Sequence, residues 1–384
     1  MPTASGSRVQ LTYIPEVTHG TTPATPAMTV LRNTGRNINP TKQELVSAEV
    51  RSDRQTAVVR HGFKQIDGSI PFELALAAYD AMLEAALASA FAVAHTQVTD
   101  VSVDTTSTFD RASGSFITDG YRIGDIIITA GFADSANNGQ FRITAVSALV
   151  VTVDATLVTE VTDPAQTMDL VGERMDVGTT LTTFTMERQF IDITQYQVFT
   201  GVAVNTMDFS IQPNAIATAS MTLLGMSGGT MSGSSVENSQ VAAATNSPMD
   251  AFAGELYEGL ASVAVVTGID FSINNQREVR GVVGQSTSPD VYEGICEITG
   301  TITIFLQDGT LYSKFLDETE SSLWVRLDDP DTATSFLNFV FPRVKYSAGD
   351  IDPPGSGPVT ISMPFRALYD ATAGTSMTIQ RSNS

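Results

Sequence analysis

The sequence has little of what most metal-dependent and secreted proteins rely on. It contains one cysteine, Cys296, which excludes an intramolecular disulfide and a thiolate metal cluster. Its three histidines, His19, His61 and His95, are not within metal-ligand spacing of one another. It has one tryptophan, Trp324, and no ladder of aromatic residues. We therefore expect no metal and no cofactor, and packing or surface roles for the histidines.

Basic residues are also scarce. Lys and Arg number 21 against 42 Asp and Glu, so the formal net charge is −21, although charged residues make up only 16% of the chain. Because nucleic-acid affinity comes mostly from Lys and Arg that displace counterions, this balance argues against a surface that grips phosphate. It is compatible with DNA sliding past an acidic wall that repels it. The alternative is that acidity keeps an abundant protein soluble.

The chain lacks long apolar runs. No apolar span approaches the length that crosses a membrane, and the N-terminal residues MPTASGSR lack the apolar core of a signal peptide. We therefore expect a protein that folds in a reducing cytoplasm and has no membrane partner. A length of 384 residues with 42% apolar content allows two or three domains with substantial cores.

Thr, Ser, Ala, Val and Gly fill the sequence instead, and this composition favours strands joined by turns. The clearest strand signal is the stretch Gly201–Gly225, in which apolar and polar residues alternate on both sides of a Pro213–Asn214 corner. Such alternation is typical of a β-hairpin. The hairpin carries no catalytic residue, and its flat ribbon is suited to pairing with other strands. The sequence predicts a mainly β fold.

The first third of the chain shows three textures. Residues 1–28 are Thr- and Pro-rich and predict an extended N-terminal arm, because the prolines are incompatible with a regular helix. Strands are expected between Met28 and Leu74, interrupted by the polar, mixed-charge segment Thr41–Thr56, which predicts a solvated loop or hairpin. Ala75–Ala92 predicts a helix, because apolar residues recur along it at three- and four-residue spacing. That apolar stripe is more typical of a core than of a cofactor site.

Two further segments separate the strand-rich blocks. Residues 93–174 contain short strands joined by turn clusters such as Ala136–Gly139. The strands before and after this segment form one strand pattern only when they are joined to each other. We therefore expect a small external β-domain inserted after the helix. Residues 226–255 are rich in Gly, Ser, Asn and Ala and predict a flexible linker.

The two strand-rich blocks resemble each other. Gly62–Leu74 matches Gly294–Leu306 without a gap, and Tyr79–Glu84 matches Tyr312–Asp317 after one residue of slippage. Both blocks run strand, glycine, strand, helix. We interpret the chain as two copies of one β-sandwich or barrel domain, each with a flanking helix.

The end of each block extends this repeat. Ala219–Leu223 corresponds in kind to Val359–Met363. The first copy then comprises residues 29–92 and 175–225, and the second comprises residues 256–384.

Two short motifs formally fit a chemical site. Gly225–Gly229 fits the G-x-S-x-G nucleophile elbow around Ser227, but the elbow needs a following helix and a Gly/Ser-rich segment follows here. Asp328–Asp331 could hold a hard cation, but it lacks the glycine turn and distal Glu of a calcium loop, so a solvated turn is expected. No glycine loop carries the Lys-Ser/Thr pair that cradles phosphate. The sequence predicts no enzyme.

Several runs together carry a family resemblance. The hairpin Gly201–Gly225 and the run Ile269–Asn275, followed by Gly294–Leu306 with Tyr312 and Phe315, resemble the signature of major tail tube proteins of long non-contractile-tailed bacteriophages, the siphophages. The resemblance covers about residues 28–92 and 175–370. It implies two packed β-sheets flanked by a helix, and a structural virion protein of the tail that is assembled in the host cytoplasm.

The resemblance also implies partners. Family members form stacked rings whose inner sheets join into one continuous β-barrel around an electronegative lumen. A tape-measure protein fills this lumen before DNA is released through it, and tail terminator and distal tail proteins are further expected partners. DNA is expected to pass without specific binding. Residues 93–174 are then an external domain of the kind that such tubes carry.

The duplication sets the expected ring. If each chain supplies two tube domains, a ring needs three chains for pseudo-sixfold geometry; without a duplication the family expectation is six. For ring-to-ring contacts we expect the mixed-charge loops Thr41–Thr56 and Arg277–Val291, with ordinary solvated loops as the alternative. The candidate contact residues are Glu44, Glu49, Arg51, Asp53, Arg54, Arg277, Glu278 and Arg280.

The sequence gives little support to two other functions. A carbohydrate-binding or adhesin-like β-protein of a virion or cell surface predicts clustered exposed aromatic residues, and the sequence shows no such cluster. A β-sandwich hydrolase predicts a His and an acidic residue that partner a nucleophile, and the sequence lacks such a set.

Overall fold

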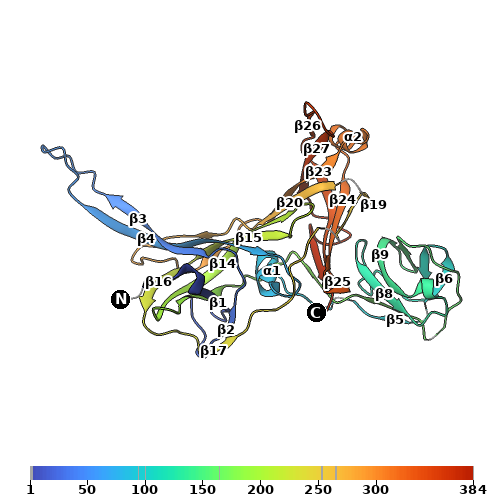
Figure 1. The fold of residues 1–384 in the computed structure, drawn as a ribbon, viewed down its shortest axis with the longest axis horizontal. Helices are drawn as coiled ribbons and strands as arrows, with labels where there is room; N and C mark the ends of the chain where they lie inside the picture. The colour runs from blue at the N-terminus through green and yellow to red at the C-terminus, as the bar shows by residue number, and fades with distance from the viewer. Residues whose placement is uncertain are drawn as a thin grey trace.

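The fold is built mainly from strands, and the mainly β prediction is confirmed. The computed structural model describes residues 3–93, 95–99, 101–163, 165–251, 254–263 and 266–383. This described part contains two α-helices, α1 (Asp80–Leu87) and α2 (Thr310–Leu316), neither long and apolar enough to cross a membrane. Figure 1 shows a main body with a hairpin projecting from one end and a separate small domain at the other.

One antiparallel sheet, which we call the long sheet, runs through the main body (Figure 1). The hairpin predicted around Pro213–Asn214 lies at its centre, and Asn214 takes the left-handed conformation, with φ 57°, that suits a turn. The order of its strands is β3 (Asn37–Val46), β4 (Val59–Glu73), β15 (Thr218–Gly225), β14 (Gln195–Ile211), β20 (Val266–Asn274), β23 (Glu297–Phe305), β27 (Thr360–Ala367) and β26 (Asp350–Asp352).

Two smaller layers complete the main body. The order of the first layer is β17 (Ser239–Val241), β2 (Ala27–Val30), β1 (Val9–Pro15), β13 (Phe184–Phe190), the start of β14, and β16 (Ser227–Ser232). The order of the second layer is β19 (Ala261–Ser262), β18 (Glu255–Glu258), β24 (Ser321–Asp329), β25 (Thr332–Tyr346), β28 (Thr378–Arg381) and β12 (Glu173–Asp176). Residues of both layers and of the long sheet belong to one continuous hydrophobic core.

Phenylalanine rings join the second layer to the middle of the long sheet. Phe209 of β14 and Phe271 of β20 are paired across the two strands, with ring centroids 4.6 Å apart. Phe339 of β25 packs edge-on against both rings, at 5.2 and 5.1 Å. Since each such pair adds about 0.5–1.5 kcal/mol beyond the area it buries, the cluster fixes the layers where β14 meets β20.

Helix α1 is shorter than the sequence predicts. The apolar stripe indicates a helix over Ala75–Ala92, whereas α1 spans Asp80–Leu87, so the predicted bounds are wrong at both ends. The backbone explains the difference, because Ala77 and Ala88 take left-handed conformations, with φ 56° and 51°, which no α-helix continues through. The stripe itself is buried as expected, and Tyr79 stacks on Phe72 at 4.1 Å.

Two segments that composition predicts as an arm and a linker contain paired strands. Val9–Pro15 of the N-terminal 28 residues forms β1, and Ala27–Val30 forms β2, which pairs in parallel with β17 (Ser239–Val241). The Gly/Ser-rich stretch after Gly225 contains β16 and β17. Its Gly228 is required by close approach, since a Cβ there would lie 2.3 Å from the Val198 carbonyl oxygen. The glycines of this stretch therefore allow β16 to pair closely with β14.

A separate seven-stranded sheet forms a small domain, here called the seven-stranded domain, between α1 and β12 (Glu173–Asp176). It has its own core around Phe109, Phe116 and Tyr121, and Figure 1 shows it beside β25. The order of its strands is β5 (Val98–Thr99), β11 (Thr167–Leu170), β8 (Ile126–Ala130), β9 (Gly139–Val146), β10 (Val150–Val153), β7 (Thr108–Asp110) and β6 (Ser102–Thr105).

Candidate assembly surface

The long sheet has one apolar and one polar face. Strict alternation along β14 buries Met207 and Phe209 and leaves Asp208 exposed. The same alternation in β20 buries Phe271 and leaves Asp270 exposed. We call the solvent-facing side of β4, β15, β14, β20, β23, β27 and β26 the polar face. Threonine and serine dominate it, so it presents short hydroxyl side chains to solvent.

The polar face is acidic. Basic side chains are few at the outward positions of these described strands: Arg366 is ion-paired with Glu297, and Arg60 lies on the exposed part of β4 toward the hairpin tip. The carboxylates at outward positions are those of Asp67, Glu73, Asp208, Asp270, Glu297 and Asp350. The negative charge of these carboxylates repels phosphate.

The polar face is also concave. A hollow of about 790 Å³ crosses it, from Thr34 and Pro71 at one end to Pro364 and Arg366 at the other. The hollow is lined by six neighbouring strands, from β4 to β27, so it follows the curvature of the sheet and is not a closed pocket between domains. No cluster of three or more His, Cys, Asp or Glu suited to a metal occurs among the described residues.

The long sheet ends in two open edges. Among the described residues, β3 pairs only with β4, and β26 pairs only with β27. Unpaired N–H and C=O groups along such edges accept another strand readily. The two edges therefore are interfaces available to another chain.

The first predicted contact loop lies at the tip of the projecting hairpin β3–β4 (Figure 1). Glu44, Glu49, Arg51, Asp53 and Arg54 are all exposed there. Arg51 and Asp53 form an ion pair at 2.8 Å, which lowers the pKa of the Asp53 carboxyl. The tip also exposes apolar side chains, namely those of Leu45, Val46, Val50, Val58 and Val59. Exposed apolar and paired charged side chains together are typical of a contact surface.

The second predicted contact loop is folded against its own chain. Arg277, predicted as a surface contact, is 5% exposed. Its guanidinium donates to the backbone carbonyls of Ala85 and Val204 and pairs with Glu293 at 3.2 Å. Burial lowers the pKa of Arg277, although Glu293 opposes the shift. Nothing in the charge pattern distinguishes this buried arginine from an exposed one.

The neighbours of Arg277 behave differently. Glu278 and Arg280, the other predicted residues of this loop, remain on the surface as an ion pair. Asn275 extends the seat of Arg277, since its side chain donates to the carbonyl of Ala86 at 2.8 Å. The loop from Asn275 to Cys296 is therefore anchored at its start, exposed over residues 281–286, and anchored again at the buried Ser288 and Val291.

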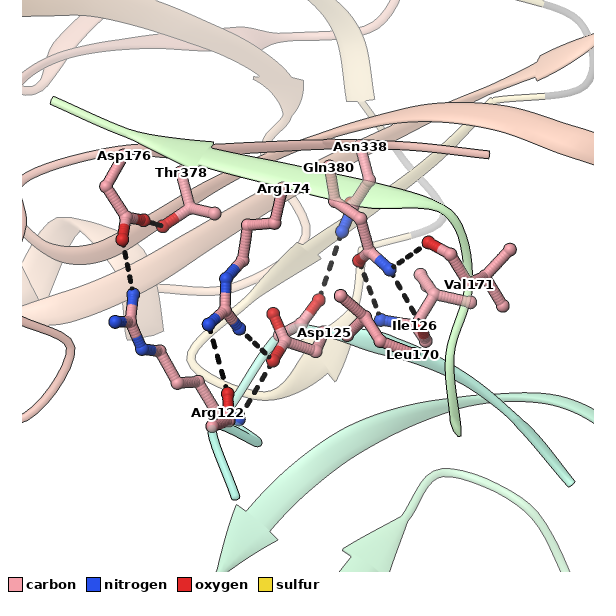
Figure 2. A network of polar contacts seen from close by, with 12 residues as sticks. Arg122, Asp125, Ile126, Leu170, Val171, Arg174, Asp176, Asn338, Thr378 and Gln380 are labelled. Atoms are coloured by element: carbon pink, nitrogen blue, oxygen red, sulfur yellow. Dashed lines mark hydrogen bonds and ion pairs between the residues drawn. The ribbon is translucent and has the colours of Figure 1, made fainter. Parts of the chain in front are cut away.

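A buried polar network fixes the seven-stranded domain to β28 (Figure 2). The Gln380 side chain accepts from the Ile126 N–H and donates to the Ile126 carbonyl, both at 2.8 Å. Asn338 of β25 donates to the Gly124 carbonyl at 3.0 Å. Arg174 and Asp125 form a buried ion pair at 2.6 Å beside them. The domain is thus held rigidly by strands of the second layer.

The motifs that formally fit a chemical site are structural. Ser227 begins strand β16, and no helix follows it, so the arrangement of a nucleophile elbow is absent at this described position. Asp328 pairs with Arg326, and the Asp329 carboxylate accepts from the Asp331 backbone N–H, which closes the turn between β24 and β25.

The histidines and the cysteine are likewise packing or surface residues. His19 pairs with Asp290 and His95 pairs with Asp169, while His61 is exposed on β4. Cys296 packs against the core, and burial raises the pKa of its thiol to about 11, so the reactive thiolate is disfavoured at neutral pH.

The acidic residues of the polar face are not among the residues predicted from the sequence. A signal was present, because the tetrapeptide Asp-Phe-Ser-Ile occurs at Asp208–Ile211 and again at Asp270–Ile273. The structure pairs these two copies antiparallel, with Phe209 opposite Phe271.

Comparison with known proteins identifies the family. A search of curated proteins finds no match. The model of the phage tail tube protein family matches residues 6–367, which include every strand of the long sheet and the seven-stranded domain. This match spans most of the 384 residues. The chain therefore belongs to the phage tail tube protein family, whose members are structural components of the virion tail that polymerise with themselves, and it is not an enzyme.

Proposed function

We propose that this chain forms stacked rings that build the tail tube of a siphophage, and that the polar face of the long sheet lines the lumen. The observation that carries the proposal is the concave, acidic polar face between two open sheet edges. Ring closure satisfies both edges, which removes the aggregation hazard of an open sheet. The signature around Gly201–Gly225 supports the non-contractile class of tail.

The chemistry of the polar face suits a conduit. Asp208, Asp270 and their neighbours present carboxylates between short hydroxyl side chains. DNA is repelled by such a wall and does not adhere to it, so DNA moves through without specific contacts. The tape-measure protein occupies the same lumen before DNA, and the tail terminator and distal tail proteins cap the ends of the tube.

We propose further that the chain contains two copies of the tube domain. The strand order supports this, since β3-β4-β15-β14 in the first half parallels β20-β23-β27 with β25 and β26 in the second. The layers β1-β13-β14-β16 and β18-β24-β25-β28 parallel each other in the same way. In each half a helix separates the two sets of strands, α1 after β4 and α2 after β23.

Two glycines support the same repeat at atomic detail. A Cβ on Gly68 would lie 2.6 Å from the Asn37 carbonyl oxygen. A Cβ on Gly300, its counterpart in the sequence repeat, would lie 2.7 Å from the Asp270 carbonyl oxygen. Both glycines thus allow the neighbouring strand to approach at the same point of the repeat.

The strand register changes one sequence match. The sequence comparison aligns Ala219–Leu223 with Val359–Met363. Met221 is opposite Ile70, and Met363 is opposite Ile302, the counterpart of Ile70. The corresponding pentapeptide is therefore Ile361–Phe365, two residues further along, and the new match makes both Ser-Met pairs coincide.

With two tube domains per chain, a ring closes with three chains in pseudo-sixfold geometry. The exposed tip of hairpin β3–β4, with Glu44, Glu49, Arg51, Asp53 and Arg54, then contacts the next ring, together with Glu278 and Arg280. Arg277 contributes by holding its loop in shape, since it is buried. The seven-stranded domain, residues 93–174, lies on the tube exterior.

Electron microscopy of the purified protein, with a mass measurement on isolated rings, tests the proposal. We expect rings of three chains and stacked tubes. Only monodisperse single chains at every concentration would refute the assembly, and rings of six chains would refute the two-domain stoichiometry. Deleting Glu49–Gln55 from the hairpin tip is expected to leave rings intact and to abolish stacking. The matched control is a deletion in the exposed Pro354–Gly357 turn.

A further inference from the structure

The chain already contains one completed junction between its two halves. β14 and β20 pair over six residues, from Thr206 opposite Asn274 to Ile211 opposite Ile269. On the apolar side of this junction Phe209 stacks on Phe271, and on the polar side Asp208 is opposite Ser272. In the order of the long sheet, β14 is the last strand of the first half and β20 is the first strand of the second.

The counterparts of these two strands form the open edges of the long sheet. β3 is the counterpart of β20, because Ile38 is opposite Gly68 and Phe271 is opposite Gly300. β26 is the counterpart of the end of β14, because Asp350 is opposite Ser362 and Asp208 is opposite Ser220. By the same correspondence, Ile351 has the position in β26 that Phe209 has in β14. Ile351 is 39% exposed, whereas Phe209 is 2% exposed.

A second feature repeats at the open end. In the first half, the start of the Asn275–Cys296 loop is seated between α1 and β14. Asn275 donates from its backbone to the Asn205 carbonyl at 2.9 Å, and Arg277 donates from its backbone to the Asn205 side chain at 2.7 Å. Arg277 also contacts the carbonyls of Ala85 and Val204.

In the second half the corresponding seat is a hollow. In the repeat, Val204 corresponds to Tyr346 and Asn205 corresponds to Ser347. The end of α1 corresponds to the residues after Leu316. A concavity of about 390 Å³ lies there, lined by Phe315, Leu316, Glu318, Lys345, Tyr346 and Ser347. Leu316 is 60% exposed, although its counterpart Leu83 is 3% exposed.

We infer that β3 of a second copy of this chain completes both features. It pairs antiparallel with β26 in the register of the internal junction, so that Ile38 is opposite Ile351 and Asn39 is opposite Asp350. The residues that follow, Lys42–Glu44, then enter the hollow beside α2, as Asn275–Arg277 enter the seat beside α1. This inference rests on the proposed ring and assigns its interface to these residues.

Cysteine cross-linking tests the register. In a chain with Cys296→Ser, the pair Asn39→Cys and Asp350→Cys introduces thiols at two exposed positions at opposite ends of the long sheet. In the inferred register they are directly opposite, with Cβ atoms about 4.5–5.5 Å apart, close to disulfide reach. The control pair, Thr41→Cys with Asp350→Cys, is displaced by two residues, about 7–8 Å, which is beyond that reach.

The readout is a non-reducing gel of oxidised rings, together with electron micrographs of the same samples. We expect at least tenfold more cross-linked chain from the matched pair than from the displaced pair, in a ladder that reductant returns to monomer. Each single-cysteine variant should keep the wild-type melting temperature and should give no species larger than two chains.

The outcomes separate the inference from the proposed function. Rings in the micrographs with cross-links equal to or weaker than those of the displaced pair overturn the register and leave the ring proposal intact. Soluble, folded variants and a wild-type chain that all fail to form rings overturn the proposed function itself. Rings with a strong matched cross-link support both.

Discussion

Arg174 and Asp125 form an ion pair at 2.6 Å in which both side chains are almost completely buried, 1% and 3% exposed. Arg174 also donates to the Gly120 carbonyl at 3.0 Å, and Asp125 accepts from the Arg122 backbone N–H at 2.9 Å. The pair joins the strand that leaves the seven-stranded domain to a turn within that domain. Two opposite charges removed from water in this way depend on each other.

We expect Asp125→Ala to destabilise the chain by about 3–5 kcal/mol, because it leaves a buried, unpaired guanidinium. Chemical denaturation measures the loss. The matched control is Glu320→Ala, which breaks the exposed Glu320–Arg343 pair at 2.6 Å and should change the stability little, because solvent screens an exposed pair. Equal losses of unfolding free energy for the two variants would contradict the expectation that the buried Arg174–Asp125 pair costs more to break than an exposed pair.

Gln380→Ala should loosen the seven-stranded domain without unfolding the long sheet. The substitution leaves the Ile126 N–H and the Val171 carbonyl without their side-chain partner, at about 1–3 kcal/mol for each unsatisfied buried group, while the Ile126 carbonyl still accepts from the Val171 N–H at 3.0 Å. Hydrogen exchange should rise across residues 120–130 and remain unchanged in β14. Gln307→Ala, in an exposed turn, is the control. Faster exchange throughout both regions would contradict a local anchor.

Gly68→Ala and Gly300→Ala should each destabilise the chain by about 1–3 kcal/mol, because the new methyl group meets a neighbouring backbone carbonyl. Gly355→Ala is the control, since nothing lies within 4 Å of a Cβ there. Thermal unfolding measures all three variants. If one of the two glycines tolerates alanine as well as Gly355 does, the two strand crossings are not equivalent and the case for two copies weakens.

The hydrogen bonds that the Glu160 carboxylate accepts should be sensitive to acid. It accepts from the Ala133 backbone N–H at 2.7 Å, then from Asp134, Asn137 and Gln166, and these bonds lower its pKa. Since its pKa is lower in the folded than in the unfolded chain, its stabilisation is present above the ordinary carboxyl pKa and is lost as pH falls through the folded value.

The melting temperatures of wild type and Glu160→Gln at pH 7 and at pH 3 test this contact. Glutamine does not titrate, so the advantage of the wild type at pH 7 should shrink at pH 3. Glu49→Gln, exposed at the hairpin tip, should show no such change. A wild-type advantage that stays constant across this range would exclude a titrating role for Glu160.

Reversing charge on the polar face should make assembled tubes bind DNA. With Asp208→Lys and Asp270→Lys we expect short duplex DNA to co-sediment with tubes at low salt and to dissociate as salt rises. Wild-type tubes and the neutral control, Asp208→Asn with Asp270→Asn, should leave the DNA in solution. DNA bound equally by wild-type tubes would refute an inert lumen wall.

Sequence patterns predicted the local structure well where period-two alternation and turn residues agree. The hairpin around Pro213–Asn214 is confirmed because alternation fixes which side of each strand is buried. The helix was predicted at the right position, but its ends depend on the left-handed residues Ala77 and Ala88. Alanine favours a helix, so nothing in the sequence marks those two positions as helix breaks.

Long-range contacts explain the remaining differences. Glycine and serine after Gly225 are typical of a linker, yet Gly228 and Gly229 allow β16 to approach β14 and Pro40 closely. Arg277 has the charge of a surface residue, yet its guanidinium is buried and donates hydrogen bonds to carbonyls of α1 and β14. In both cases the deciding partner lies tens of residues away, where propensity and spacing carry no information.

The contact between Gln380 and Ile126 has a consequence for chain synthesis. The two residues are 254 positions apart, so the seven-stranded domain can fold on the ribosome long before the glutamine that fastens it has been made. Asn338 and Thr334, which also contact the domain, are made earlier. Complete docking therefore requires translation past residue 380, and a subunit truncated before that point would reach the growing tail without the Gln380 anchor.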